Sequence, residues 1–125
     1  MAIELELSNM PADLKLKSVL SELQKDTQFF VKDVDQIWFY YSKKPNFSEI
    51  LWYVTRAVKE KYGPRLLGQM KIEVEYDCHF LEIQIPIAES GIELSDEMIG
   101  ICEEARRMYG TTASCFFLIT QYEKY

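Results

Sequence analysis

The sequence predicts an α+β domain of the ferredoxin-like type, a βαββαβ succession in which a four-stranded antiparallel sheet carries its helices on one face. Two segments, residues 46–62 and 95–109, place apolar side chains at helical spacing. Between them, residues 71–76 and 79–87 alternate between apolar and polar side chains, as the two strands of a hairpin do. Segments rich in β-branched and aromatic residues precede the first of these helices and follow the second, which completes the succession.

Composition restricts the class of protein. The chain has 125 residues, with 14 basic and 20 acidic side chains, and its formal charge is −6. Nucleic acids and anionic membranes are bound through clustered Lys and Arg, so neither is an expected partner. No apolar run approaches the roughly 18 residues of a membrane-spanning helix, and residues 1–10 lack the basic start of a signal peptide. The three cysteines have no regular spacing, which favours free thiols in a reducing compartment. We therefore expect a cytoplasmic protein.

Residues 1–30 are expected to form an extension that packs on the same domain, with residues 31–125 as the α+β core. Pro11 suits the first position of a helix. The apolar side chains that follow it share one helical face, which predicts a helix over residues 11–25; they are Leu16, Val19, Leu20 and Leu23. Residues 3–7 alternate as a short edge strand would.

Two interpretations compete for the segment that follows this helix. Aromatic and β-branched residues crowd it, and this composition favours a strand. Residues 38–41 are all aromatic, so they cannot share one stripe of a helix. Against this, apolar residues between Leu16 and Tyr41 recur at steps of four and three with no Gly or Pro between them, as in one long helix. We expect a helix and then a strand from about residue 36, and the long helix remains the alternative.

The remaining elements carry clearer signals. Asn46 and Glu49 resemble a capping box at the start of the helix over residues 46–62, and Gly63-Pro64 ends it. Trp52 and its neighbour Tyr53 lie partly off the apolar stripe, so they are candidates for contact with the N-terminal segment or a partner. The helix over residues 95–109 has acidic residues in its first turn and arginines in its last.

The hydrophobic pattern of the hairpin fixes its register, with Val74 opposite Leu81 and Ile72 opposite Ile83. Either a two-residue turn or a four-residue loop fits this register. The last strand, residues 114–122, is apolar on both faces, which predicts that it is covered on both sides.

Helices on one face of the sheet leave the other face open, and its apolar side chains then need cover by another chain or by residues 1–25. The hairpin contributes Phe80 to this face. Which residues of the first and last strands point outward is open: Trp38 and Tyr40 or Ile37, Phe39 and Tyr41 in the first, and Phe117 and Ile119 or Phe116 and Leu118 in the last. The candidate interface residues are Trp38, Tyr40, Phe80 and Phe117, and a homodimer is the expected assembly.

A candidate acidic patch lies on the same face. It consists of Glu73, Glu75 and Glu82, with Glu73 opposite Glu82 in the predicted register. Residues 69–125 hold four basic and eleven acidic side chains, whereas residues 31–68 hold seven basic and four acidic ones. The acidic C-terminal half fits either the basic middle segment of a second subunit or a basic partner, and the alternative is a solvated acidic face that aids solubility. No full set of metal ligands accompanies these glutamates, so no metal site is predicted.

The sequence contains no motif that predicts catalysis or a cofactor. Cys78 and His79 are adjacent, but neighbours on a strand point to opposite faces, which argues against a catalytic dyad. The sequence therefore favours a non-catalytic protein-interaction module, a regulator, adaptor or acidic inhibitor, that acts through an apolar sheet face and the acidic C-terminal half. The alternative is a small-ligand sensor or an enzyme of the dimeric α+β barrel type, which would use Tyr40, His79 or Glu82.

Overall fold

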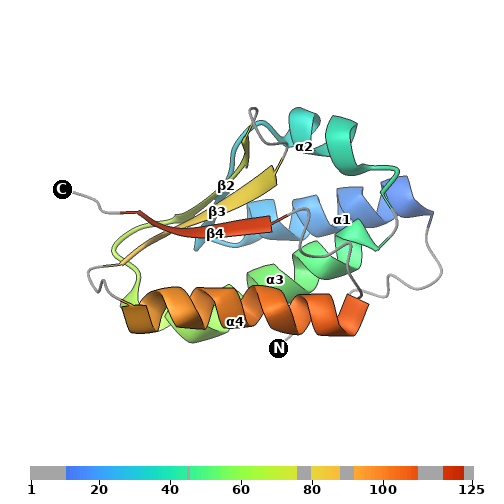
Figure 1. Ribbon diagram of the computed structural model, residues 1–125. Coiled ribbons are helices and arrows are strands. Elements are labelled where there is room, and N and C mark those ends of the chain that lie inside the picture. Colours follow the sequence, from blue (N-terminus) through green and yellow to red (C-terminus); the bar gives the residue numbers. More distant parts are fainter. Residues whose placement is uncertain (1–10, 45, 76–79, 88–91, 110–116, 123–125) are drawn as a thin grey trace.

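Helices and strands alternate along the chain in the computed structural model, which describes residues 11–44, 46–75, 80–87, 92–109 and 117–122 (Figure 1). The elements are α1 (Ala12–Lys25), β1 (Phe29–Val31), α2 (Val34–Tyr41), α3 (Phe47–Tyr62), the 3₁₀ turn η1 (Gly63–Arg65), β2 (Met70–Glu75), β3 (Phe80–Pro86), α4 (Ile92–Tyr109) and β4 (Phe117–Tyr122). The predicted α+β class is confirmed. None of the helices within these ranges combines the length and the apolar character that crossing a membrane requires.

The strands of the described residues form one mixed sheet in the order β1-β2-β3-β4. β1 is parallel to β2, β2 is antiparallel to β3, and β3 is parallel to β4. The ferredoxin-like topology is not confirmed, because that topology is antiparallel and places the first and third strands in the centre, where this sheet has β2 and β3. The sheet contains two parallel pairs because each crossover through helices places the next strand directly beside the strand that the chain has just left.

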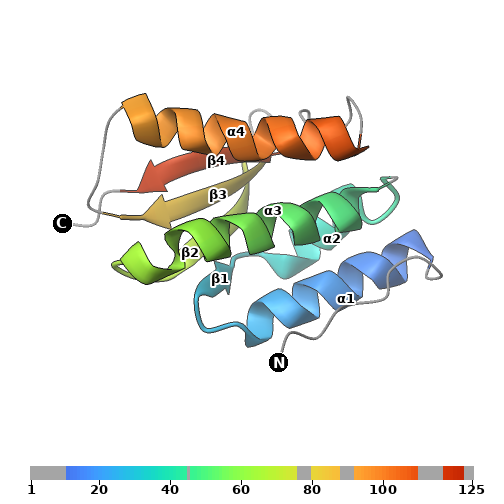
Figure 2. The same cartoon turned by 90° about the horizontal axis from the view of Figure 1, so that it is seen from below.

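Three helices, α1, α3 and α4, lie side by side in that order and cover one face of the sheet (Figure 2). α2 lies outside this layer, where it packs against α1 and the end of β2, on the far side of the molecule from α4 (Figure 1). The helical layer on one face agrees with the sequence-based expectation, whereas α2 was not expected.

The segment after α1 is neither the strand expected from residue 36 nor one long helix. The backbone N–H of Gln28 donates to Oδ1 of Asp26 at 2.9 Å, a turn that follows the end of α1 without Gly or Pro. Residues 34–41 then form α2, in which Ile37 and Tyr41 are buried one helical turn apart. The aromatic composition misled the prediction, because a helix needs only one apolar stripe and leaves Phe39 in solvent.

The hairpin has the predicted register. Ile72 pairs with Ile83 and Val74 with Leu81, and all four side chains are buried against the helices. The residues between them in sequence lie on the opposite face of the sheet. Alternation along the two strands therefore predicted both the pairing and the buried face.

The side chains of α1 belong to the same core as those of the sheet and α3. Leu16 and Val19 are fully buried, and Leu20 and Leu23 are 2% exposed. The predicted capping box at the start of α3 is absent: Asn46 has a left-handed backbone and makes no side-chain cap. Glu49 instead accepts a hydrogen bond from Nζ of Lys15 at 2.6 Å, which joins α3 to α1.

Candidate functional site

The four predicted interface residues do not come together on a described sheet face. Trp38 and Tyr40 lie on α2, where both are half-buried against the core. The backbones of Phe80 and Phe117 lie in β3 and β4, and their side chains lie outside the described part of the structure. The expectation that Trp38 and Tyr40 point from a sheet strand is therefore wrong.

The predicted acidic patch contains the expected pair but not free carboxylates. Glu73 and Glu82 are direct partners across β2 and β3. Nε2 of Gln84 donates to an oxygen of each, at 2.8 Å to Glu73 and 3.1 Å to Glu82. Nζ of Lys32 and of Lys71 lie 3.5 and 3.8 Å from the Glu73 carboxylate. This face of β2 and β3 is a polar network.

The third acidic residue, Glu75, pairs with Phe80 through the backbone, and its side chain lies outside the described part. Among the described side chains, no three metal-ligating groups gather at one place. The described carboxylates of the patch therefore serve the polar network of the sheet.

Four aromatic rings form a ladder from the core to the surface, and we call Phe39, Tyr40, Tyr41 and Phe47 the aromatic ladder. Phe47 is fully buried and Tyr41 is 3% exposed, and their rings stack in parallel with centroids 4.3 Å apart. The Tyr40 ring lies 6.3 Å from that of Tyr41 and 5.5 Å from that of Phe39. Phe39, at the outer end, is 74% exposed, more than the other large apolar side chains of the described part.

Two polar atoms of α2 are affected by burial. Burial, with a smaller effect of Tyr40, raises the pKa of Tyr41 to about 12, so this hydroxyl keeps its proton to a higher pH than an exposed tyrosine does. Nε1 of Trp38 is buried without a hydrogen-bond partner in the described structure. A buried donor without a partner costs free energy. The unpaired N–H of Trp38 therefore lowers the stability of α2 in its present position.

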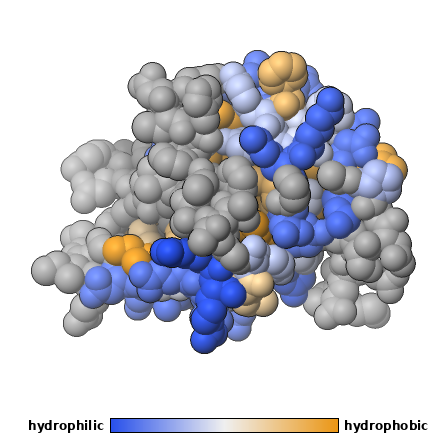
Figure 3. All heavy atoms as spheres, turned by 45° about the vertical axis from the view of Figure 1, so that its right-hand side comes forward, coloured by the Kyte–Doolittle hydropathy of each residue, from blue (hydrophilic) through white to orange (hydrophobic). Residues whose placement is uncertain are grey.

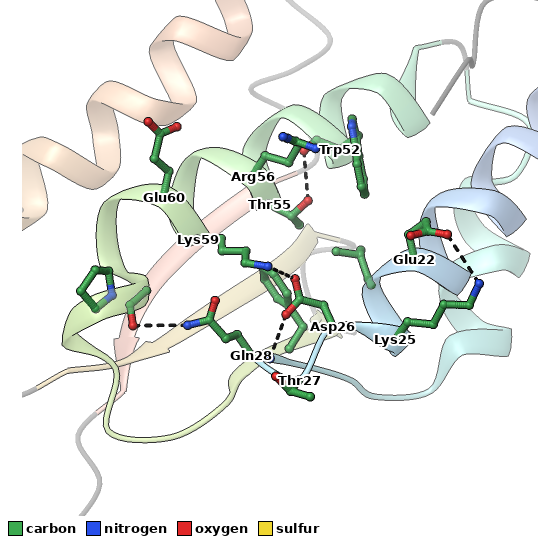
Figure 4. Close-up of a pocket in the computed structure, with 14 residues that line it drawn as sticks. Glu22, Lys25, Asp26, Thr27, Gln28, Trp52, Thr55, Arg56, Lys59 and Glu60 are labelled. Carbon is green, nitrogen blue, oxygen red and sulfur yellow. Dashed lines mark hydrogen bonds and ion pairs between the residues drawn. The ribbon is translucent and has the colours of Figure 1, made fainter. Parts of the chain in front are cut away.

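A groove of about 1000 Å³ runs between α1 and α3, and we call it the α1–α3 groove (Figure 4). It is lined by Glu22, Leu23, Lys25, Asp26, Thr27, Gln28, Phe29, Trp52, Thr55, Arg56, Lys59, Glu60, Gly63 and Pro64. Lys59 reaches from α3 to the Asp26 carboxylate, and the Gln28 amide donates to the carbonyl oxygen of Gly63 at 3.3 Å (Figure 4). These contacts hold the turn after α1 against the end of α3.

Most charges of the groove are paired with each other. Lys59 pairs with Asp26, and Lys25 pairs with Glu22. Arg56 instead places its guanidinium 5.2 Å from the centre of the Trp52 ring, a cation–π contact. Among the described residues Arg56 has no carboxylate partner.

The sequence indicates Trp52 as a contact residue but does not indicate Arg56. The spacing of four residues between the two on a predicted helix was the available signal. The contact of Gln28 with Gly63 had no such signal, because the two residues are 35 positions apart.

At the seam between α3 and α4, Tyr62 is fully buried. Its hydroxyl donates to Oε2 of Glu97 at 3.4 Å, and Arg65 lies 3.7 Å from the same oxygen. Burial and then the charge of Glu97 raise the pKa of Tyr62 to about 12. On α4, burial also raises the pKa of the Cys102 thiol, which disfavours the reactive thiolate. Cys78 and His79 lie outside the described residues.

Figure 3 shows one face of the molecule, on which hydrophilic side chains predominate in the described part and hydrophobic ones appear at separate spots. The exposed large apolar residues come from several elements: Leu14, Phe30, Phe39, Leu67, Ile99 and Met108.

Comparison of the chain with protein-family models, with curated proteins and with solved structures finds no match.

Proposed function

We propose that this protein is a non-catalytic protein-interaction module that associates with a second copy of itself through α2. The observation that carries the proposal is the exposure of Phe39 at the end of the aromatic ladder. The Phe39 ring contacts the edge of Tyr40, and aromatic side chains, Phe among them, are enriched at protein interfaces. The regulator, adaptor or inhibitor role expected from the sequence fits this kind of surface.

α2 is a better candidate for this contact than the sheet face that the sequence suggested. On that face Glu73, Glu82 and Gln84 are bonded to one another, so a partner would have to displace an existing network. Phe39 requires no such displacement, because nearly three quarters of its surface is in solvent. Burying this ring is favourable by about 1.5–3 kcal/mol before the costs of association.

The acidic C-terminal half belongs to the proposal as a determinant of partner choice. Exposed acidic residues of α4 include Asp96 and Glu103. Two like-charged surfaces repel, so a second copy is expected to approach from the side of α2 and away from α4. In the role of an inhibitor, the same acidic half suits a basic partner protein, in the cytoplasm that the composition suggests.

Light scattering coupled to gel filtration tests self-association. The wild type at micromolar concentration is expected at twice the 14.7 kDa chain mass, and Phe39→Lys is expected to be a folded monomer. Met108→Lys is the matched control, because Met108 is also an exposed apolar residue of a helix, 54% accessible, on α4. A wild type that stays monomeric at every concentration would contradict the dimer.

A further variant distinguishes a dimer contact through α2 from one through the sheet face. Phe30 is 49% exposed and lies in β1, with its neighbours Phe29 and Val31 buried on the helical side. If Phe30→Lys dissociates the dimer and Phe39→Lys does not, the contact lies on the sheet and not on α2. Trp38→Lys is a poor test, since Trp38 is half-buried against the core and its loss would also destabilise the fold.

A further inference from the structure

The geometry points to the α1–α3 groove as a binding site for a carboxylate carried on an apolar body, with Arg56 as the residue that binds the carboxylate. This inference is independent of the proposed self-association, because it concerns a different face and a different kind of ligand.

The size and lining of the groove suit a small ligand. Its volume of about 1000 Å³ is at the upper end of the range for small-molecule sites. Trp52 and Pro64 supply apolar surface, and Gln28 supplies an amide oxygen that accepts no hydrogen bond from the described residues. An apolar wall with a few convergent polar groups is the general composition of ligand sites.

The pairing of the charged side chains in the groove indicates which sign of charge a ligand there would carry. Six charged side chains line the groove, three of each sign. Four of them neutralise one another as Lys59–Asp26 and Lys25–Glu22. Glu60 is directed toward α4 and away from the Lys59–Asp26 pair, whereas Arg56 extends along α3 beside Trp52 (Figure 4). Arg56 is therefore the cation of the groove that no described carboxylate neutralises, and it is the group that an anionic ligand would meet beside Trp52.

The guanidinium of Arg56 is positioned to bind a planar anion. The carbon of this guanidinium lies 5.2 Å from the centre of the Trp52 ring, a cation–π contact that holds the group beside the groove. Among the described residues no carboxylate pairs with its N–H donors, and their fork geometry matches the two oxygens of a carboxylate. A ring or aliphatic chain attached to that carboxylate then lies along the part of the groove wall that Trp52 forms. The source is either a free organic acid or the C-terminal carboxylate of a peptide.

Nuclear magnetic resonance can test the site, because the chain has two tryptophans, one in each region. Titration of the ¹⁵N-labelled protein with phenylacetate is expected to shift the indole N–H signal of Trp52 saturably and to leave that of Trp38 unmoved. Phenylacetamide, which has the same shape without the charge, is expected to cause no saturable shift. Inorganic phosphate serves as the second control, and an equal response to phosphate would overturn the assignment of a carboxylate.

Variants of exposed residues of α3 complete the test. Arg56→Gln is expected to weaken phenylacetate binding by about tenfold or more, and Arg56→Lys by less, because Lys keeps the charge but not the fork. Lys61→Gln removes the same charge from an exposed position of α3 outside the groove, and it is expected to bind as the wild type does. Equal binding by Arg56→Gln and the wild type would overturn the proposal, as would the absence of any Trp52 shift.

A pair of acetylated dipeptides distinguishes the two sources of the carboxylate. Acetyl-Ala-Phe with a free C-terminus is compared with the same peptide as its carboxamide. Tighter binding of the free acid peptide than of phenylacetate assigns the site to a chain terminus, and the reverse order assigns it to a small organic acid. A carboxamide that binds as well as the acid would contradict both. Failure of the α2 dimer has no effect on these results, since Trp38 reports on α2 separately.

Discussion

Glu73 and Glu82 stand directly opposite one another across β2 and β3, although both side chains are acidic. Like charges in this position weaken a strand pair. The Gln84 amide, which donates to both carboxylates, offsets the repulsion, and Lys32 and Lys71 add positive charge on the side of Glu73. The pair is thus part of the structure of the sheet, and its environment makes a metal ion unnecessary for charge balance.

Gln84→Glu replaces the bridging donor with a third carboxylate at nearly the same shape. We expect a loss of about 1–2 kcal/mol in the free energy of unfolding at neutral pH, measured by urea denaturation, because a hydrogen bond is lost and repulsion is added. The loss should shrink in high salt, which screens the charges. Gln24→Glu on the exposed side of α1 is the matched control and should change stability little. Equal effects of the two variants would contradict the role of Gln84.

Gly100→Ala should stabilise the protein by about 0.5–1 kcal/mol, because glycine inside a helix loses more conformational freedom than alanine on folding. Gly100 is exposed on α4, and a Cβ atom there would meet no atom within 4 Å. At Gly63, by contrast, a Cβ would lie 3.3 Å from the Gln28 amide, so Gly63→Ala should gain less. Thermal unfolding of both variants measures the difference, and a destabilising Gly100→Ala would show that this glycine has a role not visible in the described contacts.

Stability should fall as pH rises from about 10 to about 12. Tyr41 and Tyr62 have pKa values near 12 in the folded chain, against about 10 in an unfolded one. The folded state therefore holds more protons in this range, and the free energy of unfolding decreases as pH increases. Below pH 10 both states are protonated and this contribution is constant.

Tyr62→Phe removes one of these groups, and its stability should depend less steeply on pH in that window when followed by urea denaturation. Tyr40→Phe is the comparison and should change the slope less, because Tyr40 contributes only the smaller part of the raised pKa of Tyr41. An unchanged slope for Tyr62→Phe would contradict the assignment.

Leu16→Ala should cost about 2–5 kcal/mol and leave a single unfolding transition. Leu16 is fully buried in α1 and belongs to the same core as Ile83 of the sheet, so a cavity there affects the whole domain. Ile83→Ala is expected to have a similar effect. Two separate transitions in calorimetry, one of them unaffected by Leu16→Ala, would show instead that α1 folds as an independent extension.

Local patterns predicted the parts of the fold that depend on neighbours in sequence. The alternation around Ile72 and Ile83 fixed the hairpin register, since a shift by one residue would expose every apolar side chain of a strand. Helical spacing and Gly63-Pro64 likewise located α3 and its end. α1 was placed by the four buried residues of its apolar stripe.

The sequence by itself thus determined the α+β class, the hairpin and the three long helices, because periodicity records which side of each element faces a core. Only the tertiary structure decided that residues 34–41 are a helix, since the burial of Ile37 and Tyr41 there outweighs the strand preference of aromatic residues. It also decided the order of the strands and brought Asp26 to Lys59, 33 residues away. Such contacts follow from how the crossovers pack, and no local pattern encodes them.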